Sequence, residues 1–262
     1  MFKAGLIVLS LAMAGFAPLT TPAAPAADSA RDIVAGADRV RNPERPFRVN
    51  ATVIEYKSGK PVDKNTFAVY SKVDPATGQF RDVMVYVSPP RDAGKMLLLN
   101  GSNLWFYDPA SRQSVRISPQ QKLTGEASAG DVLSENLGVD YIATLLGSDT
   151  IDDAARQKRQ CWRLDLAAAG DAATYKRVEY WVEEGTYNPI KAKFYADSGE
   201  LLKVLYYRNF VRRGDRVSPA QAVIIDAVDA TLVTVVDISE LHFQDIPDNW
   251  FHRDYLPHLK LD

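Results

Sequence analysis

The chain contains 262 residues, of which 46% are hydrophobic and 24% are charged, and its formal net charge at pH 7 is only −2. Because this charge is nearly balanced, the composition does not favour nucleic acid or an anionic membrane surface as the binding partner. The single cysteine excludes an intramolecular disulfide, and a domain of this size can bury enough apolar surface without one.

The first predicted element is a secretory signal peptide over residues 1–26. A short basic start precedes an uncharged and mostly apolar run from Ala4 to Ala17, and Ala24-Pro25-Ala26 fits the small-residue rule for cleavage. Prolines interrupt this region, whereas a membrane helix needs about 20 consecutive apolar residues. No cysteine lies near the cleavage zone, which excludes lipid attachment there. We therefore expect an exported protein of a bacterial envelope compartment, without a stable membrane anchor after signal removal and with a single domain over residues 27–262.

A short amphipathic helix is predicted next, with Asp28 as its cap and Asn42-Pro43 as its end. Alternating apolar and polar residues then predict strands near 47–53, 66–73 and 79–88, separated by turns rich in Gly, Pro and Asp. Short strands at regular spacing that are joined by such turns are typical of an antiparallel sheet.

The stretch from Met96 to Asp108 predicts a further hairpin that turns at Asn100-Gly101, with Leu97 opposite Leu104 and Met96 opposite Trp105. Because side chains alternate along a strand, one face of the hairpin carries Leu97, Leu99, Leu104 and Phe106. The opposite face carries Met96, Leu98, Trp105 and Tyr107. Since both faces are apolar, either helices cover one side of an ordinary core, or a curved sheet encloses a hydrophobic cavity. On the second interpretation the candidate ligand-binding residues are Leu97, Leu99, Leu104, Trp105, Phe106 and Tyr107.

The middle of the chain predicts short helices that pack onto the sheet. Ser118-Pro119-Gln120-Gln121 has the pattern of a helix start over 119–123, and Asp131 and Asp140 are candidate caps for two more helices between 131 and 146. Helices this short gain their stability from packing, so we expect them to cover the cavity as a lid. The candidate lid residues are Leu123, Val132, Leu133, Leu137, Tyr141, Ile142 and Leu145.

Strands resume between Cys161 and Ile238 and bring the predicted total to about eleven, so the fold class is mainly β (α+β) with one large antiparallel sheet. The tail after residue 244 is predicted to be irregular and to dock through its large apolar residues, Trp250, Phe251, Tyr255 and Leu256.

Recognisable catalytic and cofactor motifs are missing from the sequence. It contains no Gly-x-Ser-x-Gly elbow, no phosphate-binding glycine loop and no His-Glu-x-x-His. The three histidines lie in the last 21 residues at spacings unsuited to a zinc site. Cys161 has no assignable base beside it and is more typical of a small buried apolar residue. The sequence thus favours a protein that is not an enzyme and has no cofactor or metal, although a triad assembled from distant residues stays open.

The run NGSNLWFYDPASRQSV resembles the LolA-like family of outer-membrane lipoprotein-sorting proteins, in which a strand, a Gly turn and a Leu-Trp-x-Tyr-x-Pro run occur in this order. Further segments are similar to the wider family, among them RPFRVNATVIEY, VSPPRDAGKMLLLNG and EYWVEEGTYNPIKAKFYADSGELLKVLYY, and they spread over roughly Asp32 to Pro257. The residues that match the aromatic run are Gly101, Leu104, Trp105, Tyr107 and Pro109.

The resemblance implies an unclosed β-barrel with short helices over a hydrophobic cavity. It also implies a periplasmic, non-enzymatic carrier or chaperone that binds lipoprotein acyl chains or another lipid. The family's cavity arginine lies in a strand before the aromatic run; here the nearby arginine, Arg91, lies in a Pro-Pro loop, so that role is not assigned to it. The alternative function is an accessory or sensor subunit of an inner-membrane permease of the resistance-nodulation-division type, or of an envelope-stress regulator. An exposed aromatic patch near Trp250 and Tyr255 would favour this alternative.

Overall fold

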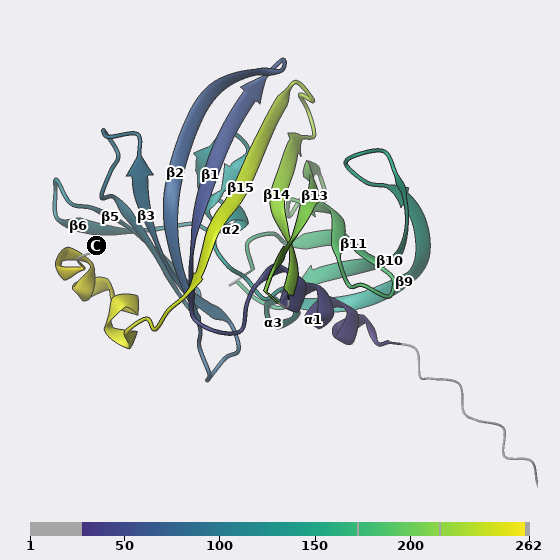
Figure 1. The fold of residues 1–262 in the computed structure, drawn as a ribbon, viewed down its shortest axis with the longest axis horizontal. Helices are drawn as coiled ribbons and strands as arrows, with labels where there is room; N and C mark the ends of the chain where they lie inside the picture. The colour runs from purple at the N-terminus through teal and green to yellow at the C-terminus, as the bar shows by residue number, and fades with distance from the viewer. Residues whose placement is uncertain (1–27, 172, 215, 260–262) are drawn as a thin grey trace, which may run out of the picture.

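The computed structural model describes residues 28–171, 173–214 and 216–259 (Figure 1). The predicted signal peptide, residues 1–26, lies outside the described residues. Within the described ranges, no helix combines the length and the apolar character needed to cross a membrane.

Most of the described chain forms strands of a single large sheet. Their bounds are β1 (Phe47–Lys57), β2 (Lys60–Val73), β3 (Phe80–Ser88), β4 (Met96–Asn100), β5 (Asn103–Asp108), β6 (Gln113–Ile117), β9 (Tyr141–Asp152), β10 (Lys158–Ala168), β11 (Arg177–Glu183), β12 (Pro189–Tyr195), β13 (Leu201–Arg213), β14 (Arg216–Asp226) and β15 (Leu232–Phe243). These thirteen strands pair in the order β6-β5-β4-β3-β2-β1-β15-β14-β13-β12-β11-β10-β9. Because β1 pairs with β15, strands from the two ends of the chain meet in the middle of the sheet.

The sheet curves strongly, but its two edge strands, β6 and β9, do not pair with each other, so the barrel is not closed (Figure 1). This confirms the predicted fold class. The described residues contain fifteen strands, more than the predicted total of about eleven. Three of them were not expected: β9, which was predicted to be helical in its first half, and the two strands of a small separate hairpin, β7 (Lys122–Thr124) and β8 (Ala127–Ser128).

The helix α1 (Ala30–Arg41) lies inside the curve of the sheet (Figure 1). Its buried side chains Ile33, Val34 and Ala37 recur at helical spacing, as predicted, and they face the sheet. The predicted end at Asn42 is confirmed, but the cap is Ser29, whose side chain accepts a hydrogen bond from the Asp32 N–H at 3.2 Å.

Two of the predicted helices are wrong. Residues 119–123 form a turn and the first two residues of β7, and residues 141–146 are the start of β9, an edge strand that pairs with β10 along its whole length. The helices actually present in this region are single turns, α2 (Ala129–Val132) and α3 (Leu137–Asp140). Asp140 therefore ends a helix instead of beginning one. Pairing with the next strand, β10, satisfies the backbone of β9, which a marginal isolated helix could not do as well.

The hairpin of β4 and β5 turns at Gly101-Ser102, one residue later than predicted, and pairs Leu97 with Phe106 and Leu99 with Leu104. The predicted pairing is thus slipped by two residues. Because side chains alternate with a period of two, this slip leaves both predicted faces intact. Leu97, Leu99 and Leu104 point into the main core, whereas Met96, Leu98 and Tyr107 belong to a second apolar cluster on the opposite face.

The C-terminal segment covers that second face. It carries two short 3-10 helices beside the outer surface of the sheet, η1 (Asp248–Phe251) and η2 (Arg253–His258) (Figure 1). The first of them, η1, lies against β3 and β4, and η2 packs on η1. Its buried apolar residues, Ile246, Phe251, Leu256 and Leu259, share the second cluster with the hairpin. The two apolar faces of the hairpin are therefore covered by different elements, and the predicted docking of the tail is confirmed.

Candidate functional site

A cavity of about 140 Å³ lies between the inner face of the sheet and a segment that crosses it, residues 129–141, which we call the cover segment. The cover segment contains α2 and α3. On the sheet side, the walls are mainly apolar and come from strands distant in sequence, β1 and β11 to β15. The apolar lining residues of these strands are Phe47, Val49, Val178, Ala192, Phe194, Leu205, Tyr207, Ala222, Val236, Ile238 and Leu241.

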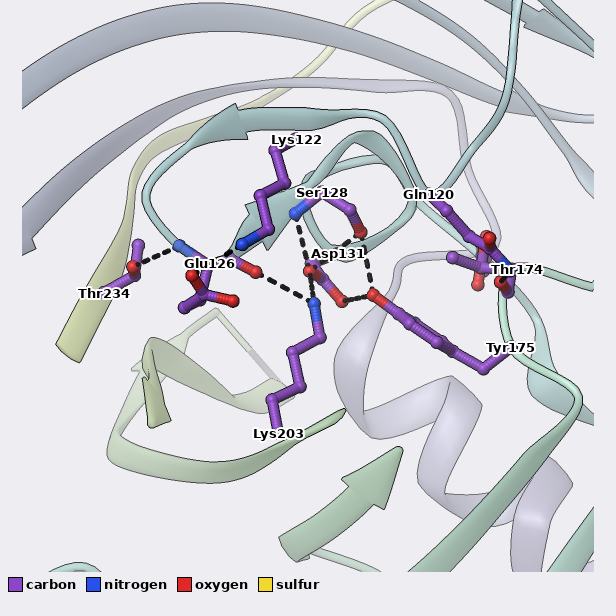
Figure 2. A network of polar contacts seen from close by, with 10 residues as sticks. Gln120, Lys122, Glu126, Ser128, Asp131, Thr174, Tyr175, Lys203 and Thr234 are labelled. Carbon is purple, nitrogen blue, oxygen red and sulfur yellow. Dashed lines mark hydrogen bonds and ion pairs between the residues drawn. The ribbon is translucent and has the colours of Figure 1, made fainter. Parts of the chain in front are cut away.

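A buried ion pair joins the cover segment to the sheet (Figure 2). The Lys203 ammonium, on the inner face of β13, pairs with Asp131 in α2, and their side chains are only 6% and 2% exposed. Lys203 Nζ also donates to the Glu126 carbonyl at 2.9 Å and lies 4.9 Å from the ring centroid of Tyr175. Asp131 accepts from the Ser128 N–H at 2.8 Å and from the Tyr175 hydroxyl at 3.0 Å. Every charge in this network therefore has partners, as a buried ion pair requires.

The end of α1 holds the cover segment at a second place. Arg41 Nη2 donates to Asp38 Oδ1 and to the Glu135 carbonyl, both at 2.7 Å, and the Asn42 amide donates to the same carbonyl at 2.9 Å. Asp38 in turn accepts from the Gly138 N–H at 2.9 Å. The backbone of the cover segment, which has few hydrogen bonds of its own, is thus satisfied by side chains of α1.

Two buried carboxyl groups lie at the contact between the cover segment and the rest of the protein. Burial raises the pKa of Glu135 to about 8, although its hydrogen bond from Thr174 lowers it in part. Burial also raises the pKa of Asp82 to about 7, against hydrogen bonds from Ser71 and Ser134. Since Glu135 and Ser134 belong to the cover segment, the ionisation of both carboxyls is coupled to its placement.

The predicted lid residues fall into three groups. Val132, Leu133, Leu137 and Tyr141 line the cavity from the cover segment. Leu123 lies in β7 and packs against the main core without lining the cavity. Ile142 and Leu145 lie in β9, where their side chains are 65% and 38% exposed, because this edge strand directs them toward solvent.

None of the six candidate hairpin residues lines this cavity. Leu97, Leu99, Leu104 and Phe106 contribute to the same main core as the cavity walls, whereas Trp105 and Tyr107 face the C-terminal segment. Their role as ligand-binding residues stays a prediction. The strands β3 to β5 lie on the far side of β1 and β2 from the cavity, and this separation depends on the pairing order of the whole sheet.

Sequence reasoning missed the charged residues that line the cavity and Lys203, which holds the cover segment. One signal was available for Lys203, which occupies an inward position of the alternation in LLKVLYY together with Leu205 and Tyr207. A lysine at such a position needs a buried partner. No local pattern indicates that the partner is Asp131.

The aromatic residues of the tail do not form the exposed patch that the permease or sensor interpretation would favour. Trp250 and Tyr255 are half-buried against the second apolar cluster, and Trp250 packs edge-on against Tyr70 at 5.3 Å between ring centroids. Among the candidates for nucleophilic chemistry, Cys161 is buried, and burial raises the pKa of its thiol to about 12.

Comparisons with known proteins identify relatives over most of the chain. A family model with the description "Uncharacterized protein" matches residues 78–258, and no curated protein matches. A solved outer-membrane lipoprotein-sorting protein domain from Vibrio parahaemolyticus is 17% identical, with 87% of this chain and 98% of that chain covered and a TM-score of 0.72. A DUF1329 family protein from Desulfovibrio piger is 22% identical, with 87% and 97% covered and a TM-score of 0.71.

A third solved structure carries the family assignment. A LolA superfamily protein from Nitrosomonas europaea is 31% identical to this chain and has a TM-score of 0.78. The match covers 87% of this chain and 100% of that one. This protein therefore belongs to the LolA superfamily.

Proposed function

We propose that this protein is a periplasmic, non-enzymatic carrier or chaperone that binds the acyl chains of a lipoprotein, or another lipid, in the cavity beneath the cover segment. The observation that carries the proposal is the apolar cavity between the sheet and residues 129–141. Membership of the LolA superfamily supports it, as does the lipoprotein-sorting description of the Vibrio parahaemolyticus domain with the same fold.

The driving force would be burial of chain methylenes, worth about 0.8 kcal/mol for each group removed from water. A volume of about 140 Å³ is close to the roughly 150 Å³ of an engineered apolar cavity that holds benzene. A longer acyl chain therefore requires the cover segment to move away from the sheet.

The construction of the cover segment is suited to such a movement. Its two helices are single turns, which are marginal by themselves, and side chains of α1 and the Lys203–Asp131 pair hold it in place. Displacing it breaks these polar contacts and the packing of Val132, Leu133 and Leu137 on the main core, while the thirteen-stranded ladder behind it stays intact.

Lipid extraction and mass spectrometry of the protein purified from the periplasm test the proposal. In a matched pair of variants, Ala222→Phe places a ring in the cavity from β14, and Ala167→Phe adds the same ring to an exposed position of β10. Excluding two methylenes, at about 0.8 kcal/mol each, weakens binding roughly tenfold. We expect Ala222→Phe to lose most of the co-purified lipid and Ala167→Phe to retain it.

Equal lipid in the two variants would place the binding site elsewhere. Absence of bound or exchangeable lipid in the wild-type protein would reject the carrier function itself.

A further inference from the structure

One charged side chain that lines the cavity, Arg213, is hydrogen-bonded to uncharged groups. Arg213 is the last residue of β13, half-buried, and it lines the cavity next to the β13–β14 turn. Its Nη1 donates to the Ser218 hydroxyl at 2.8 Å and its Nη2 donates to the Ile238 carbonyl at 2.9 Å. Both acceptors also line the cavity. These two hydrogen bonds hold the guanidinium at the cavity wall.

Neither partner of Arg213 carries a charge. No carboxylate of the described residues lies within ion-pair distance of its guanidinium, and burial lowers its pKa without an opposing acidic neighbour. A cation that is partly removed from water without a counter-ion is unfavourable, and an anion brought to it offsets this cost.

The acidic residues of the cavity wall cannot supply that counter-charge. Asp131 is already paired with Lys203, and burial keeps the pKa of Glu135 near 8, so its carboxyl is mostly protonated at neutral pH. Asp38, the carboxylate nearest to the end of α1, is held by the Arg41 guanidinium. These carboxyls therefore leave the charge of Arg213 uncompensated.

The chemistry of a guanidinium defines what would compensate it. Arginine has five N–H donors in a planar fork that matches carboxylate and phosphate oxygens. Two donors are used by Ser218 and Ile238, and the others are available to an anion at the cavity wall. Ile238, whose carbonyl accepts from Arg213, also lines the cavity, and Leu205, Tyr207 and Ala222 continue its apolar wall further along β13 and β14. This wall is suited to an apolar chain.

We infer that the lipid bound by this protein carries an anionic head group, a carboxylate or a phosphate, which Arg213 binds at the β13–β14 end of the cavity while the acyl chain occupies the apolar part. This inference deepens the proposed function and rests on it. It narrows the ligand from any hydrophobic molecule to an anionic amphiphile.

A matched set of twelve-carbon ligands tests the inference on the full mature chain: dodecanoate, dodecyl phosphate and the uncharged dodecanol. Their dissociation constants are measured by displacement of a neutral fluorescent probe. We expect the wild-type protein to bind at least one of the two anions about tenfold or more tightly than dodecanol, and the preferred anion distinguishes a carboxylate from a phosphate ligand.

The decisive variant is Arg213→Gln, which keeps hydrogen-bond donors but removes the charge. This variant should bind dodecanoate and dodecyl phosphate with nearly the same affinity as dodecanol. Arg212→Gln is the control, because it removes the same charge from the neighbouring exposed residue of β13. It should retain the wild-type preference. If Arg213→Gln does not fold, Arg213→Lys keeps the charge without the fork and should show a reduced preference.

Two failures are distinguishable. If wild type binds dodecanol as tightly as both anions, or if Arg213→Gln retains the preference, the head-group inference is wrong and the carrier function stands. If none of the three ligands binds the wild-type protein, the carrier function fails and the inference fails with it.

Discussion

The Lys203 ammonium on β13 is paired with the carboxylate of Asp131 in α2, 72 residues earlier in the chain, and both side chains are almost completely buried (Figure 2). The pair connects the sheet to the segment that covers the cavity. Removing one partner of such a pair leaves the other as an unpaired charge in an apolar surrounding.

Replacing Lys203 by Met should therefore lower the free energy of unfolding by about 3–5 kcal/mol, since Asp131 loses its counter-ion. Urea denaturation measures this difference. Lys122→Met is the matched control, because Lys122 pairs with Glu126 at the surface, with 62% of its side chain exposed, and such a pair is worth about 0–1 kcal/mol. The double variant Lys203→Met with Asp131→Asn should recover part of the loss. Similar losses in Lys203→Met and Lys122→Met would contradict this role of the buried pair.

The stability of the protein should decrease as the pH rises from about 5 to about 9. Burial raises the pKa of Glu135 from 4.5 to about 8. Its stabilising contribution is therefore fully present below the unfolded pKa of about 4.5 and is lost as the pH rises through about 8. Asp82 acts in the same direction, with a pKa of about 7.

Glu135→Gln removes the titrating group while its amide oxygen can still accept the hydrogen bond from Thr174. We expect the unfolding free energy of this variant to depend less on pH than that of wild type. Between about pH 5 and about pH 9, the decrease in wild type should exceed the decrease in the variant by an amount on the order of a few kcal/mol. Urea denaturation at about pH 5, 7 and 9 checks this. Parallel pH profiles for wild type and variant would show that Glu135 does not titrate in this way.

The C-terminal segment should be essential for stability although it lies outside the main core. Phe251 is 1% exposed in the second apolar cluster, and Arg81 lies over its ring at 5.0 Å. Phe251→Ala should lower the unfolding free energy by about 3–5 kcal/mol, whereas Val228→Ala, at a position 85% exposed, should change it by less than about 0.5 kcal/mol. Thermal denaturation with limited proteolysis of the tail checks both. A stable Phe251→Ala protein with a protected tail would argue against this packing.

Substitutions at two glycines with positive φ distinguish the cost of backbone strain from the cost of steric crowding. Gly59 (φ +78°) has open space where a methyl group would lie, so Gly59→Ala should cost about 1–2 kcal/mol through strain alone. At Gly125 (φ +53°), a Cβ would lie 2.4 Å from Thr234 Oγ1, which accepts the Glu126 N–H at 2.8 Å. Gly125→Ala should therefore destabilise the protein more than Gly59→Ala in urea denaturation. Equal effects would mean that Thr234 moves aside freely.

The two apolar faces of the hairpin from Met96 to Asp108 could be predicted from the sequence, because alternation depends only on the period of two along each strand. The observed register differs by two residues, which leaves that period unchanged. What covers each face could not be predicted. The C-terminal segment is about 150 residues away in sequence, as the hydrogen bond from the Asn100 amide to the Phe251 carbonyl illustrates.

The helix predicted for residues 141–146 was wrong because a local pattern could not identify the element that these residues pair with. The apolar residues near Leu145 satisfy a helical spacing as well as a strand spacing, and short apolar runs do not distinguish the two. Pairing with β10 decides the outcome, since it supplies the backbone hydrogen bonds of the whole strand.

By itself, the sequence determined the antiparallel architecture, the two-faced strands, the helix that contains Ile33 and Val34, and the resemblance to the LolA-like family, because all of these depend on local periodicity or on contiguous motifs. The position of the cavity and the charges around it depend instead on contacts between segments that are distant in the sequence. Its walls come from β1, β11 to β15, the end of α1 and the cover segment, which meet because β1 pairs with β15 in the middle of the sheet. Lys203 and Asp131 meet because the cover segment folds onto the inner face of β13, 72 residues later in the chain, and no local pattern of residues specifies that contact.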